Sequence, residues 1–178
     1  MKILAVLVLV VLSFQVLAQK KTLYDFNAKT IDGDKYNFSG LKGKKVLIVN
    51  IATECSLAPQ LHKLQELYGE FGGDDFEIIA FPCNDFGKQE PGTNSEVKEK
   101  CSRKYEITFQ LMEKIKIKGD SIHPIYQWLT SSDENGVLDA KVTWNYQKFL
   151  INENGEVVDA VAPIISPKSN RIMEWLIE

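Results

Sequence analysis

Two runs of consecutive apolar residues lie in the first half of the chain, and both predict strands buried on two faces. The first is KKVLIVNIA at 44–52, and the second is FEIIAFP at 76–82. Uninterrupted runs of this kind are typical of central strands that helices cover on both sides. Between them, 57–71 carries leucines and aromatic residues at helical spacing, and two glycines at 72–73 end that pattern. The sequence therefore predicts a strand, a helix and a second strand.

Other periodic patterns lie on both sides of this unit. Residues 23–40 predict two short strands around an Asp-Gly turn, and 144–162 predict a hairpin around an Asn-Gly turn. No repeat, low-complexity segment or linker interrupts the chain. Buried strands that alternate with helices, followed by a hairpin and a helix, predict one α/β domain with mixed strand directions. Further helices are expected over 95–105, 123–132 and 166–178.

The first residues do not fit that domain. Lys2 precedes an apolar stretch at 3–14, and the residues VLA at 16–18 offer a cleavage site. Together these features predict a secretory signal peptide over 1–18. The apolar stretch is short and no stop-transfer pattern follows it, which disfavours a retained transmembrane helix. We therefore expect a single mature domain at 19–178, exported to the periplasm or the extracellular space, without stable membrane insertion.

Composition and charge exclude several classes of function. The chain has 178 residues, of which 44% are hydrophobic and 25% charged, as in a soluble globular protein. Without Lys2, Lys plus Arg falls from 21 to 20 against 24 acidic residues, a net charge of about −4. No basic stripe is available to follow phosphates, so no nucleic-acid partner is expected. His62 and His123 have no second ligand near them in sequence, so neither a metal nor another cofactor is expected.

The three cysteines, Cys55, Cys83 and Cys101, are an odd number and lie far apart, unlike those of a disulfide scaffold. Cys55 follows the first buried strand and precedes a helix, where N–H groups and the helix dipole favour a thiolate over a thiol. A thiolate attacks a peroxide oxygen and becomes a sulfenic acid. Position alone also allows the other reading, in which Cys55 is a buried structural residue.

Two later segments carry neutral hydrogen-bond donors. The loop FPCNDFGKQEPG at 81–92 contains Gln89 and is constrained by its proline and glycine residues. The segment WNYQKFL at 144–150 begins with Trp144 and Asn145. Considered one at a time, each has an ordinary structural explanation, as a surface glutamine, a core tryptophan and a turn asparagine. Taken together, they would stabilise a nearby thiolate and hold a peroxide with its leaving hydroxide.

Five segments follow one another along the chain: ATEC, LYGEF, IIAFPCNDFGKQEPG, HPIYQWL and WNYQKFLINENGEVV. In their order and approximate spacing they resemble the glutathione peroxidase family, from about residue 23 to the C-terminus. The resemblance implies a thioredoxin-like fold, in which helices flank a mixed central sheet and an extra β-hairpin lies at the N-terminus. It also implies a role in the response to oxidative stress, through reduction of hydrogen peroxide or organic hydroperoxides by glutathione or a thioredoxin-like protein.

The same resemblance assigns the site residues. The family's catalytic tetrad falls on Cys55, Gln89, Trp144 and Asn145, with Cys55 as the peroxidatic nucleophile. Cys101 lies near the place where thioredoxin-dependent members carry a resolving cysteine. A disulfide needs Cα atoms within about 7 Å, so Cys101 could resolve only if its helix unwinds. A resolving role and a bystander role both stay open for Cys101.

The chain also departs from the family's pattern next to the nucleophile. The family usually has Gly after this cysteine and Thr two residues later, whereas this chain has Ser56, Leu57 and Ala58. Glu54 adds a negative charge beside a group that should ionise. These departures leave open an alternative function, a catalytically weakened redox-sensing or disulfide-relay protein on the same fold.

Two further expectations concern the rest of the chain. Cys83, in the FPCN segment, is interpreted as a buried structural residue. The stretch 130–143 is short, and tetrameric relatives carry a longer insertion there, so a monomer is expected.

Overall fold

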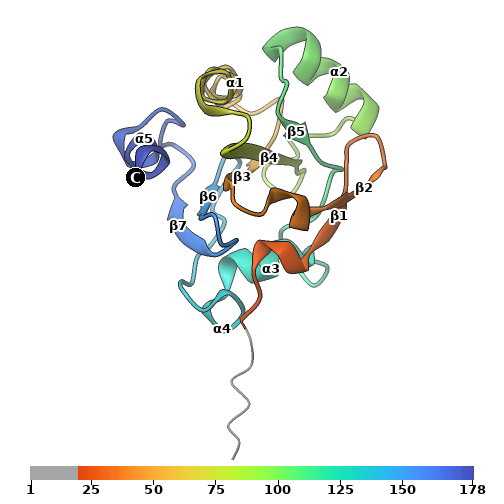
Figure 1. The fold of residues 1–178 in the computed structure, drawn as a ribbon. Helices are drawn as coiled ribbons and strands as arrows, with labels where there is room; N and C mark the ends of the chain where they lie inside the picture. Colours follow the sequence, from red (N-terminus) through yellow and green to blue (C-terminus); the bar gives the residue numbers. More distant parts are fainter. Residues whose placement is uncertain (1–19) are drawn as a thin grey trace, which may run out of the picture.

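The computed structural model describes residues 20–178, so the predicted signal peptide lies outside the described residues. Five strands form the central sheet: β3 (Lys45–Ile51), β4 (Phe76–Pro82), β5 (Gln110–Leu111), β6 (Lys148–Ile151) and β7 (Val157–Val161). Their order across the sheet is β5-β4-β3-β6-β7 (Figure 1). β3 pairs in parallel with β4 and antiparallel with β6. The two apolar runs are thus the central strands, and the predicted mixed sheet is confirmed.

A separate hairpin precedes this sheet, as predicted. Its strands, β1 (Asn27–Lys29) and β2 (Lys35–Asn37), pair antiparallel. The turn between them contains Gly33, whose φ of +90° lies in the left-handed region that glycine adopts without strain.

The helices flank the sheet on both faces. Figure 1 shows α1 and α2 on one side of it and α3 and α4 on the other. The predicted helices are all present, and α2 begins with a capping box in which the Thr93 N–H donates to Glu96 Oε2 at 2.7 Å. The helices are α1 (Gln60–Phe71), α2 (Asn94–Tyr105), α3 (Pro124–Thr130), α4 (Ser132–Asn135) and α5 (Asn170–Ile177), with 3₁₀ turns at Leu23–Asp25 and Phe38–Leu41.

Helix α1 begins later than its apolar spacing predicted. The expected start was residue 57, but the first helical residue is Gln60 and Pro59 takes the N-cap position. The residues before it form hydrogen-bonded turns instead, in which the Ala58 N–H donates to the Cys55 carbonyl at 2.9 Å. Leu57 packs against the core from this turn, so its apolar character marks burial and not helical structure.

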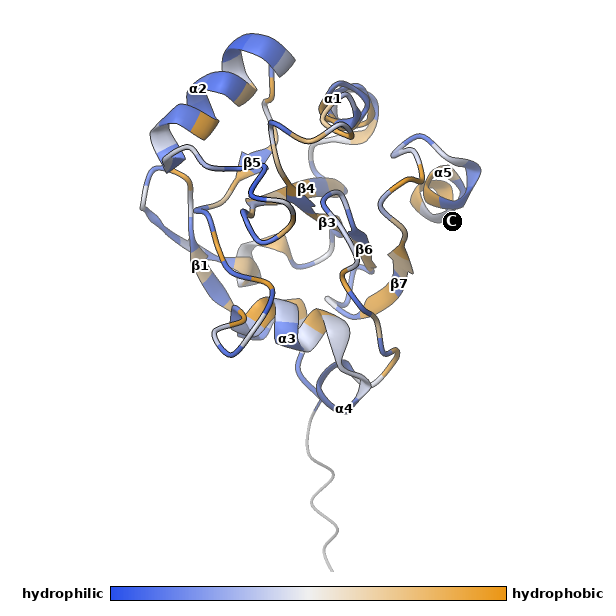
Figure 2. Cartoon of the chain, turned by 180° about the vertical axis from the view of Figure 1, so that it is seen from behind, coloured by the Kyte–Doolittle hydropathy of each residue, from blue (hydrophilic) through white to orange (hydrophobic). Residues whose placement is uncertain are grey.

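Two hydrophobic clusters form the core, one on each face of the sheet. Because successive side chains of a strand point to opposite faces, Leu47 and Val49 of β3 enter one cluster and Val46 and Ile48 the other. The first cluster is covered by α1, α2 and α5, and the second by α3 and the N-terminal segment. Figure 2 shows that α2 is otherwise largely hydrophilic, as expected for a helix on the outside of the fold.

A buried lysine in the sheet forms hydrogen bonds to the segment after β7. Lys148 is fully buried in β6, and its Nζ donates to the Pro163 carbonyl at 3.1 Å and to the Ile165 carbonyl at 2.7 Å. Burial lowers the pKa of Lys148 to about 7. The Pro163 carbonyl also accepts from Gln60 Nε2 at 2.7 Å. This hydrogen bond connects the first residue of α1 to the segment that follows β7.

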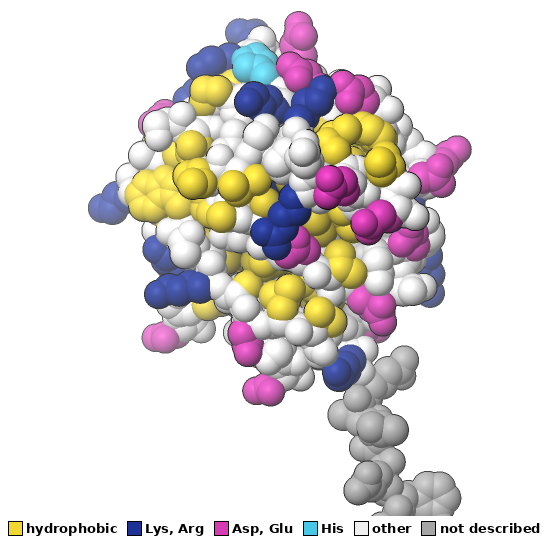
Figure 3. All heavy atoms as spheres, turned by 90° about the vertical axis from the view of Figure 1, so that its left-hand side faces the viewer, with side chains coloured by type: hydrophobic (Ala, Val, Ile, Leu, Met, Phe, Trp, Pro, Cys, Tyr) yellow, Lys and Arg dark blue, Asp and Glu magenta, His cyan; other side chains and the backbone are white. Residues whose placement is uncertain are grey.

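The surface of the described residues carries few large exposed hydrophobic side chains. Figure 3, which faces the side that lies at the left in Figure 1, shows hydrophobic groups separated by charged ones. Within 20–178, no helix combines the length and the apolar character needed to cross a membrane. The exposed large hydrophobic residues are Val137, Trp144, Val158, Ile164 and Ile177.

Candidate active site

Cys55 lies in a tight turn between β3 and α1. Its N–H donates to the Ala52 carbonyl at 3.3 Å, and the residue is 5% exposed. Its Sγ accepts the N–H of Leu57 at 3.4 Å. The sequence predicted a contact with the N-terminus of the following helix, but α1 begins only at Gln60. The N–H that reaches the sulfur therefore comes from the turn itself.

The unusual residues after Cys55 fit this turn without backbone strain. Among residues 20–178, the non-glycine residues with positive φ are Lys88, Glu106 and Tyr146, so Ser56 has an ordinary backbone conformation. A glycine is not required there, and the replacement of Gly by Ser leaves the turn intact. Ala58 is buried in the core cluster that also contains Cys55.

The carboxylate of Glu54, the residue before Cys55, is paired with a lysine. Its side chain is exposed and forms an ion pair with Lys100 of α2, at 3.3 Å between Oε1 and Nζ. The charge of Glu54 is therefore both solvated and compensated by Lys100.

Gln89 and Asn145 are joined directly. Asn145 is fully buried, and its Nδ2 donates to Gln89 Oε1 at 3.1 Å and to the Phe86 carbonyl at 3.4 Å. The Gln89 oxygen is thereby occupied, while its Nε2 donates to no residue within 20–178. A carboxamide held in this way keeps its N–H groups for an external acceptor.

Trp144 lies beside the same loop. It is 38% exposed, and its ring meets that of Phe86 edge to face, with centroids 5.9 Å apart. Gly87 has φ +66°, and a Cβ on it would lie 3.4 Å from the side chains of both Gln89 and Trp144. A Cβ at that distance would make only ordinary contact, so the position favours glycine for its left-handed backbone conformation.

Hydrogen bonds bring the 81–92 loop and the WNY segment to the turn that contains Cys55. The Glu54 N–H donates to the Gln89 carbonyl at 3.1 Å. The Tyr146 hydroxyl donates to the Ala52 carbonyl at 2.8 Å, the same oxygen that accepts the Cys55 N–H. Burial raises the pKa of Tyr146 well above its usual value, and the neighbouring Cys55 raises it further.

The four predicted residues thus lie on three segments that hydrogen-bond to one another. Within 20–178, no hydrogen bond joins Cys55 Sγ to Gln89 or Trp144, and the sulfur's single donor is the Leu57 N–H. Hydrogen bonds of this kind often form only when substrate binds. The arrangement provides a thiol, a free amide donor and a half-exposed indole around one turn.

The sequence model of the glutathione peroxidase family matches residues 23–130. The chain belongs to the glutathione peroxidase family. It is 41% identical over 145 residues to the glutathione peroxidase-like peroxiredoxin gpx1 of Schizosaccharomyces pombe, an alignment that covers 82% of this chain and 91% of that protein. The protein is accordingly a peroxidase, an oxidoreductase that uses a hydroperoxide and a thiol reductant.

Solved structures agree with this assignment. The crystal structure of Trgpx in its apo form superposes with a TM-score of 0.68 at 30% identity, and the match covers 89% of this chain and 97% of that one. A thioredoxin-family thiol:disulfide interchange protein from Chlorobium tepidum gives a TM-score of 0.60 at 20% identity, covering 90% and 99%. The second likeness concerns the fold alone, and it confirms the predicted thioredoxin-like architecture.

The other two cysteines of this peroxidase are more deeply buried than Cys55. Cys83 and Cys101 have no exposed surface, and none of the three cysteines forms a disulfide. Burial raises the pKa of both thiols to about 12. Cys101 lies on α2, in the same core cluster as Cys55. Cys83 is buried, as the sequence predicted.

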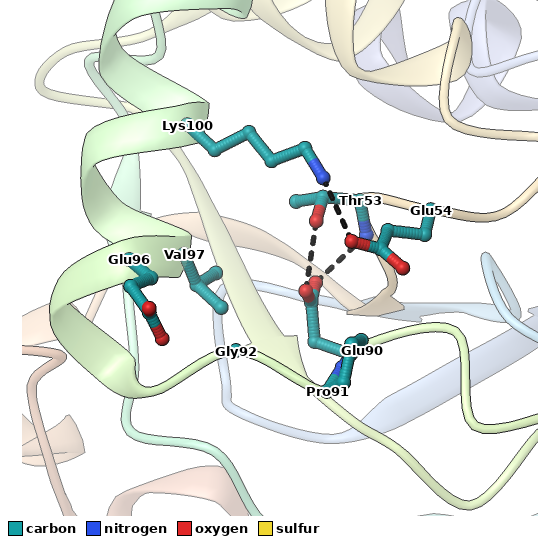
Figure 4. A pocket seen from close by; sticks show the side chains of 8 residues that line it. All are labelled: Thr53, Glu54, Glu90, Pro91, Gly92, Glu96, Val97 and Lys100. Carbon is teal, nitrogen blue, oxygen red and sulfur yellow. Dashed lines mark hydrogen bonds and ion pairs between the residues drawn. The ribbon is translucent and has the colours of Figure 1, made fainter.

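A pocket of about 420 Å³ lies between α2 and the residues just before Cys55, Thr53 and Glu54 (Figure 4). Its floor is the buried carboxylate of Glu90, which binds Thr53. Sequence analysis missed Glu90 and Tyr146, because neither the buried acid nor the tyrosine hydroxyl has a pattern that distinguishes it from a surface or core residue. Within 20–178, no group of three His, Cys, Asp or Glu residues is placed to hold a metal ion.

Proposed function

We propose that the protein is an exported thiol peroxidase in which Cys55 reduces hydrogen peroxide or organic hydroperoxides as part of a response to oxidative stress. The observation that carries this proposal is the pairing of Gln89 with Asn145. It leaves the Gln89 Nε2 donors unused on a loop that is itself bonded to the nucleophile turn. Such neutral donors stabilise an anion without locking it into an ion pair.

The oxidative half-reaction would proceed on the Cys55 sulfur. The thiolate attacks one peroxide oxygen, the O–O bond breaks, and the sulfur becomes a sulfenic acid. The leaving hydroxide or alkoxide takes up a proton and departs as water or an alcohol. Gln89 and Trp144 would orient the peroxide and donate to the oxygen on which negative charge develops. Asn145, whose Nδ2 already binds Gln89 Oε1, would hold the Gln89 side chain in place.

The reductive half-reaction requires a second thiol. A thiolate attacks the Cys55 sulfenic sulfur, a disulfide forms and water leaves, and a further thiol then restores Cys55. We propose that the donor is a thioredoxin-like protein or glutathione. Cys101 acts as an internal resolving residue if α2 unwinds. Burial raises the pKa of the Cys101 thiol to about 12, so its thiolate would form readily only if this movement exposed it.

The test is stopped-flow oxidation of the purified mature domain by hydrogen peroxide and by an organic hydroperoxide, with thioredoxin and glutathione compared as donors. We expect Cys55→Ser to abolish peroxide consumption, and Gln89→Ala to slow the first step by about 100- to 1,000-fold, as for loss of an oxyanion donor. Gln65→Ala is the matched control and should leave the rate unchanged, because this half-buried glutamine of α1 hydrogen-bonds Thr108 and no residue of the candidate site.

Two outcomes would contradict this function. Full peroxide turnover in Cys55→Ser would remove Cys55 from the chemistry. A single slow oxidation of Cys55 without donor-driven turnover would favour the redox-sensing or disulfide-relay alternative. Mass mapping of a Cys55–Cys101 link after one turnover decides whether Cys101 resolves.

The proposed location and assembly have their own tests. Export of the full chain should release a product that begins near Gln19, as N-terminal sequencing of the secreted fraction would show. The short 130–143 stretch leads us to propose a monomer, which light scattering of the purified domain would check.

A further inference from the structure

The most deeply buried carboxylate beside the candidate site belongs to Glu90, which is 1% exposed. Its Oε2 accepts the Thr53 N–H at 2.7 Å, and its Oε1 accepts the Thr53 hydroxyl at 2.8 Å (Figure 4). Both oxygens therefore bind one residue, and that residue lies two positions before Cys55. The Glu90 carboxylate thus forms two hydrogen bonds to the segment that leads into the Cys55 turn. We call this pair of hydrogen bonds the clamp.

The backbone of Glu90 is held as firmly as its side chain. Its N–H donates to Asn84 Oδ1 at 2.8 Å, and its carbonyl accepts from Lys114 Nζ at 2.8 Å. Lys114 also donates to the Gly92 carbonyl. These hydrogen bonds hold Glu90 in place within the loop that also carries Gln89.

Thr53 in turn connects the parts of the candidate site. The residue before it, Ala52, provides the carbonyl that accepts both the Cys55 N–H and the Tyr146 hydroxyl. The residue after it, Glu54, donates its N–H to the Gln89 carbonyl at 3.1 Å. A rotation of the Thr53 peptide would therefore displace the Cys55 turn and separate it from Gln89.

We propose that Glu90 is a positioning residue for the peroxidase reaction, one that fixes the Cys55 turn against the Gln89 loop through Thr53. This inference rests on the proposed role of Cys55. Glu90 touches neither the sulfur nor a substrate, so it acts on the rate only through the geometry of the turn.

The chemistry of the site favours a positioning role over a contribution to folding alone. Burial raises the pKa of Glu90, and the two bonds from Thr53 together with Lys114 and Lys100 oppose that rise. A buried carboxylate is costly in folding free energy unless it is paired and hydrogen-bonded. What a carboxylate provides here is two acceptors in one plane, which bind the N–H and the hydroxyl of the same residue.

Four variants and one control test the clamp. Glu90→Ala removes both acceptors, and Thr53→Val removes only the hydroxyl bond. Glu90→Gln keeps the shape, because its Oε1 can accept the N–H while its Nε2 donates to the hydroxyl oxygen. The fourth variant combines Glu90→Ala with Thr53→Val. Glu96→Gln, which removes a charge from the same pocket without touching Thr53, is the matched control.

Two rates are measured on each folded variant: oxidation of Cys55 by hydrogen peroxide, and alkylation of Cys55 by iodoacetamide without peroxide. We expect Glu90→Ala to lower the oxidation rate by about 10- to 100-fold, the effect of misplacing a reacting group by about 1 Å. Thr53→Val should lower it by about 3- to 10-fold. The double variant should match Glu90→Ala, because the two residues form one interaction.

The conservative variants and the alkylation rate separate positioning from general stability. Glu90→Gln should recover most of the rate that Glu90→Ala loses, and Glu96→Gln should match the wild type. A purely structural role would lower the free energy of unfolding while both rates of the folded protein stayed unchanged. A folded Glu90→Ala with wild-type oxidation and alkylation rates therefore overturns the proposal.

The remaining outcomes are also decisive. If Glu90→Ala does not fold, Thr53→Val takes its place, and a wild-type rate in that variant overturns the clamp. If the wild type itself consumes no peroxide, the proposed function fails, while altered alkylation in Glu90→Ala still supports the clamp. Failure of the function and failure of the clamp thus give different results.

Discussion

Cys55 and Cys83 follow neighbouring parallel strands, β3 and β4, at the same edge of the sheet. Each sulfur accepts the N–H of the residue two positions later, Leu57 for Cys55 and Asp85 for Cys83, and both distances are 3.4 Å. The two thiols therefore have the same place in the topology and the same local hydrogen bond. Any difference in their chemistry has to come from their surroundings.

Those surroundings lie on opposite faces of the sheet. Cys83 packs in the cluster under α3, close to Tyr126, and burial raises the pKa of its thiol to about 12. Cys55 packs in the cluster under α1, and the loop bonded to its turn carries the free amide donor of Gln89. A strand end and one N–H do not by themselves make a thiol reactive. Neutral donors on adjoining segments distinguish Cys55. Its neighbouring carboxylate, Glu54, is paired with Lys100, whereas Asp85 helps to raise the pKa of Cys83.

The largest expected difference between the two cysteines is in their rates of alkylation. At about pH 8, a thiol whose pKa is about 12 is ionised to roughly one part in 10⁴, and only the thiolate reacts. We expect iodoacetamide to label Cys55 at least about 100-fold faster than Cys83 in the folded protein, as peptide mass mapping would show. Labelling in guanidinium is the control, and there the cysteines should react alike. Equal labelling rates of Cys55 and Cys83 in the folded protein would contradict the expected difference in reactivity.

A smaller difference is expected in alkaline stability. The pKa of Cys83 is raised to about 12 in the folded state, above the unfolded value of about 8.5. Its contribution to stability is therefore complete below about pH 8.5 and is lost as the pH rises toward 12. Relative to Cys83→Ala, the wild type should lose about 2 kcal/mol of unfolding free energy between about pH 8.5 and pH 10.

Denaturant titrations at a series of pH values measure this loss. Cys101→Ala is a useful companion, since burial raises the pKa of its thiol to about 12 as well and the same sign applies. Parallel stability curves for the wild type and Cys83→Ala would show that the Cys83 thiol ionises equally in both states, against this prediction.

The smallest expected difference separates the tyrosines that accompany the two cysteines. The Tyr126 hydroxyl, near Cys83, has no hydrogen-bond partner within residues 20–178, whereas the Tyr146 hydroxyl donates to the Ala52 carbonyl. Tyr126→Phe should therefore be neutral or stabilising. Tyr146→Phe should cost about 1 kcal/mol, the net value of a hydrogen bond, and should slow Cys55 oxidation. Thermal unfolding of both variants checks this, and the opposite ranking would contradict it.

The central strands and the hairpins could be predicted from the sequence because each depends on local information. Residues 46–52 are apolar except for Asn50, and a run of this kind is typical of a strand covered on both faces. Asp-Gly and Asn-Gly turns define the hairpins by backbone conformation alone. The start of α1 could not be predicted this way, because Leu57 satisfies helical spacing while it packs from a turn.

The residues of the candidate site likewise include some that the sequence predicted and one that it missed. Cys55, Gln89, Trp144 and Asn145 were found through short motifs, and the structure places them on segments that bond to one another. Glu90 was missed because an acidic residue in a polar loop has the composition of solvated surface. Its burial depends on Thr53 and Lys114, which are distant in sequence and meet it only after folding.

The left-handed backbone of Tyr146, with φ of +71°, determines how the site tolerates insertions and deletions. In a regular strand neighbouring side chains point to opposite faces. Here Asn145 and Tyr146 are both buried while Trp144 is half-exposed. The left-handed conformation of Tyr146 therefore interrupts the alternation of side chains just before β6. A one-residue insertion or deletion here would move three side chains at once, because β6 is held in register by β3. Length variation among proteins built on this plan should therefore be found in the loops on either side of the segment, and not within it.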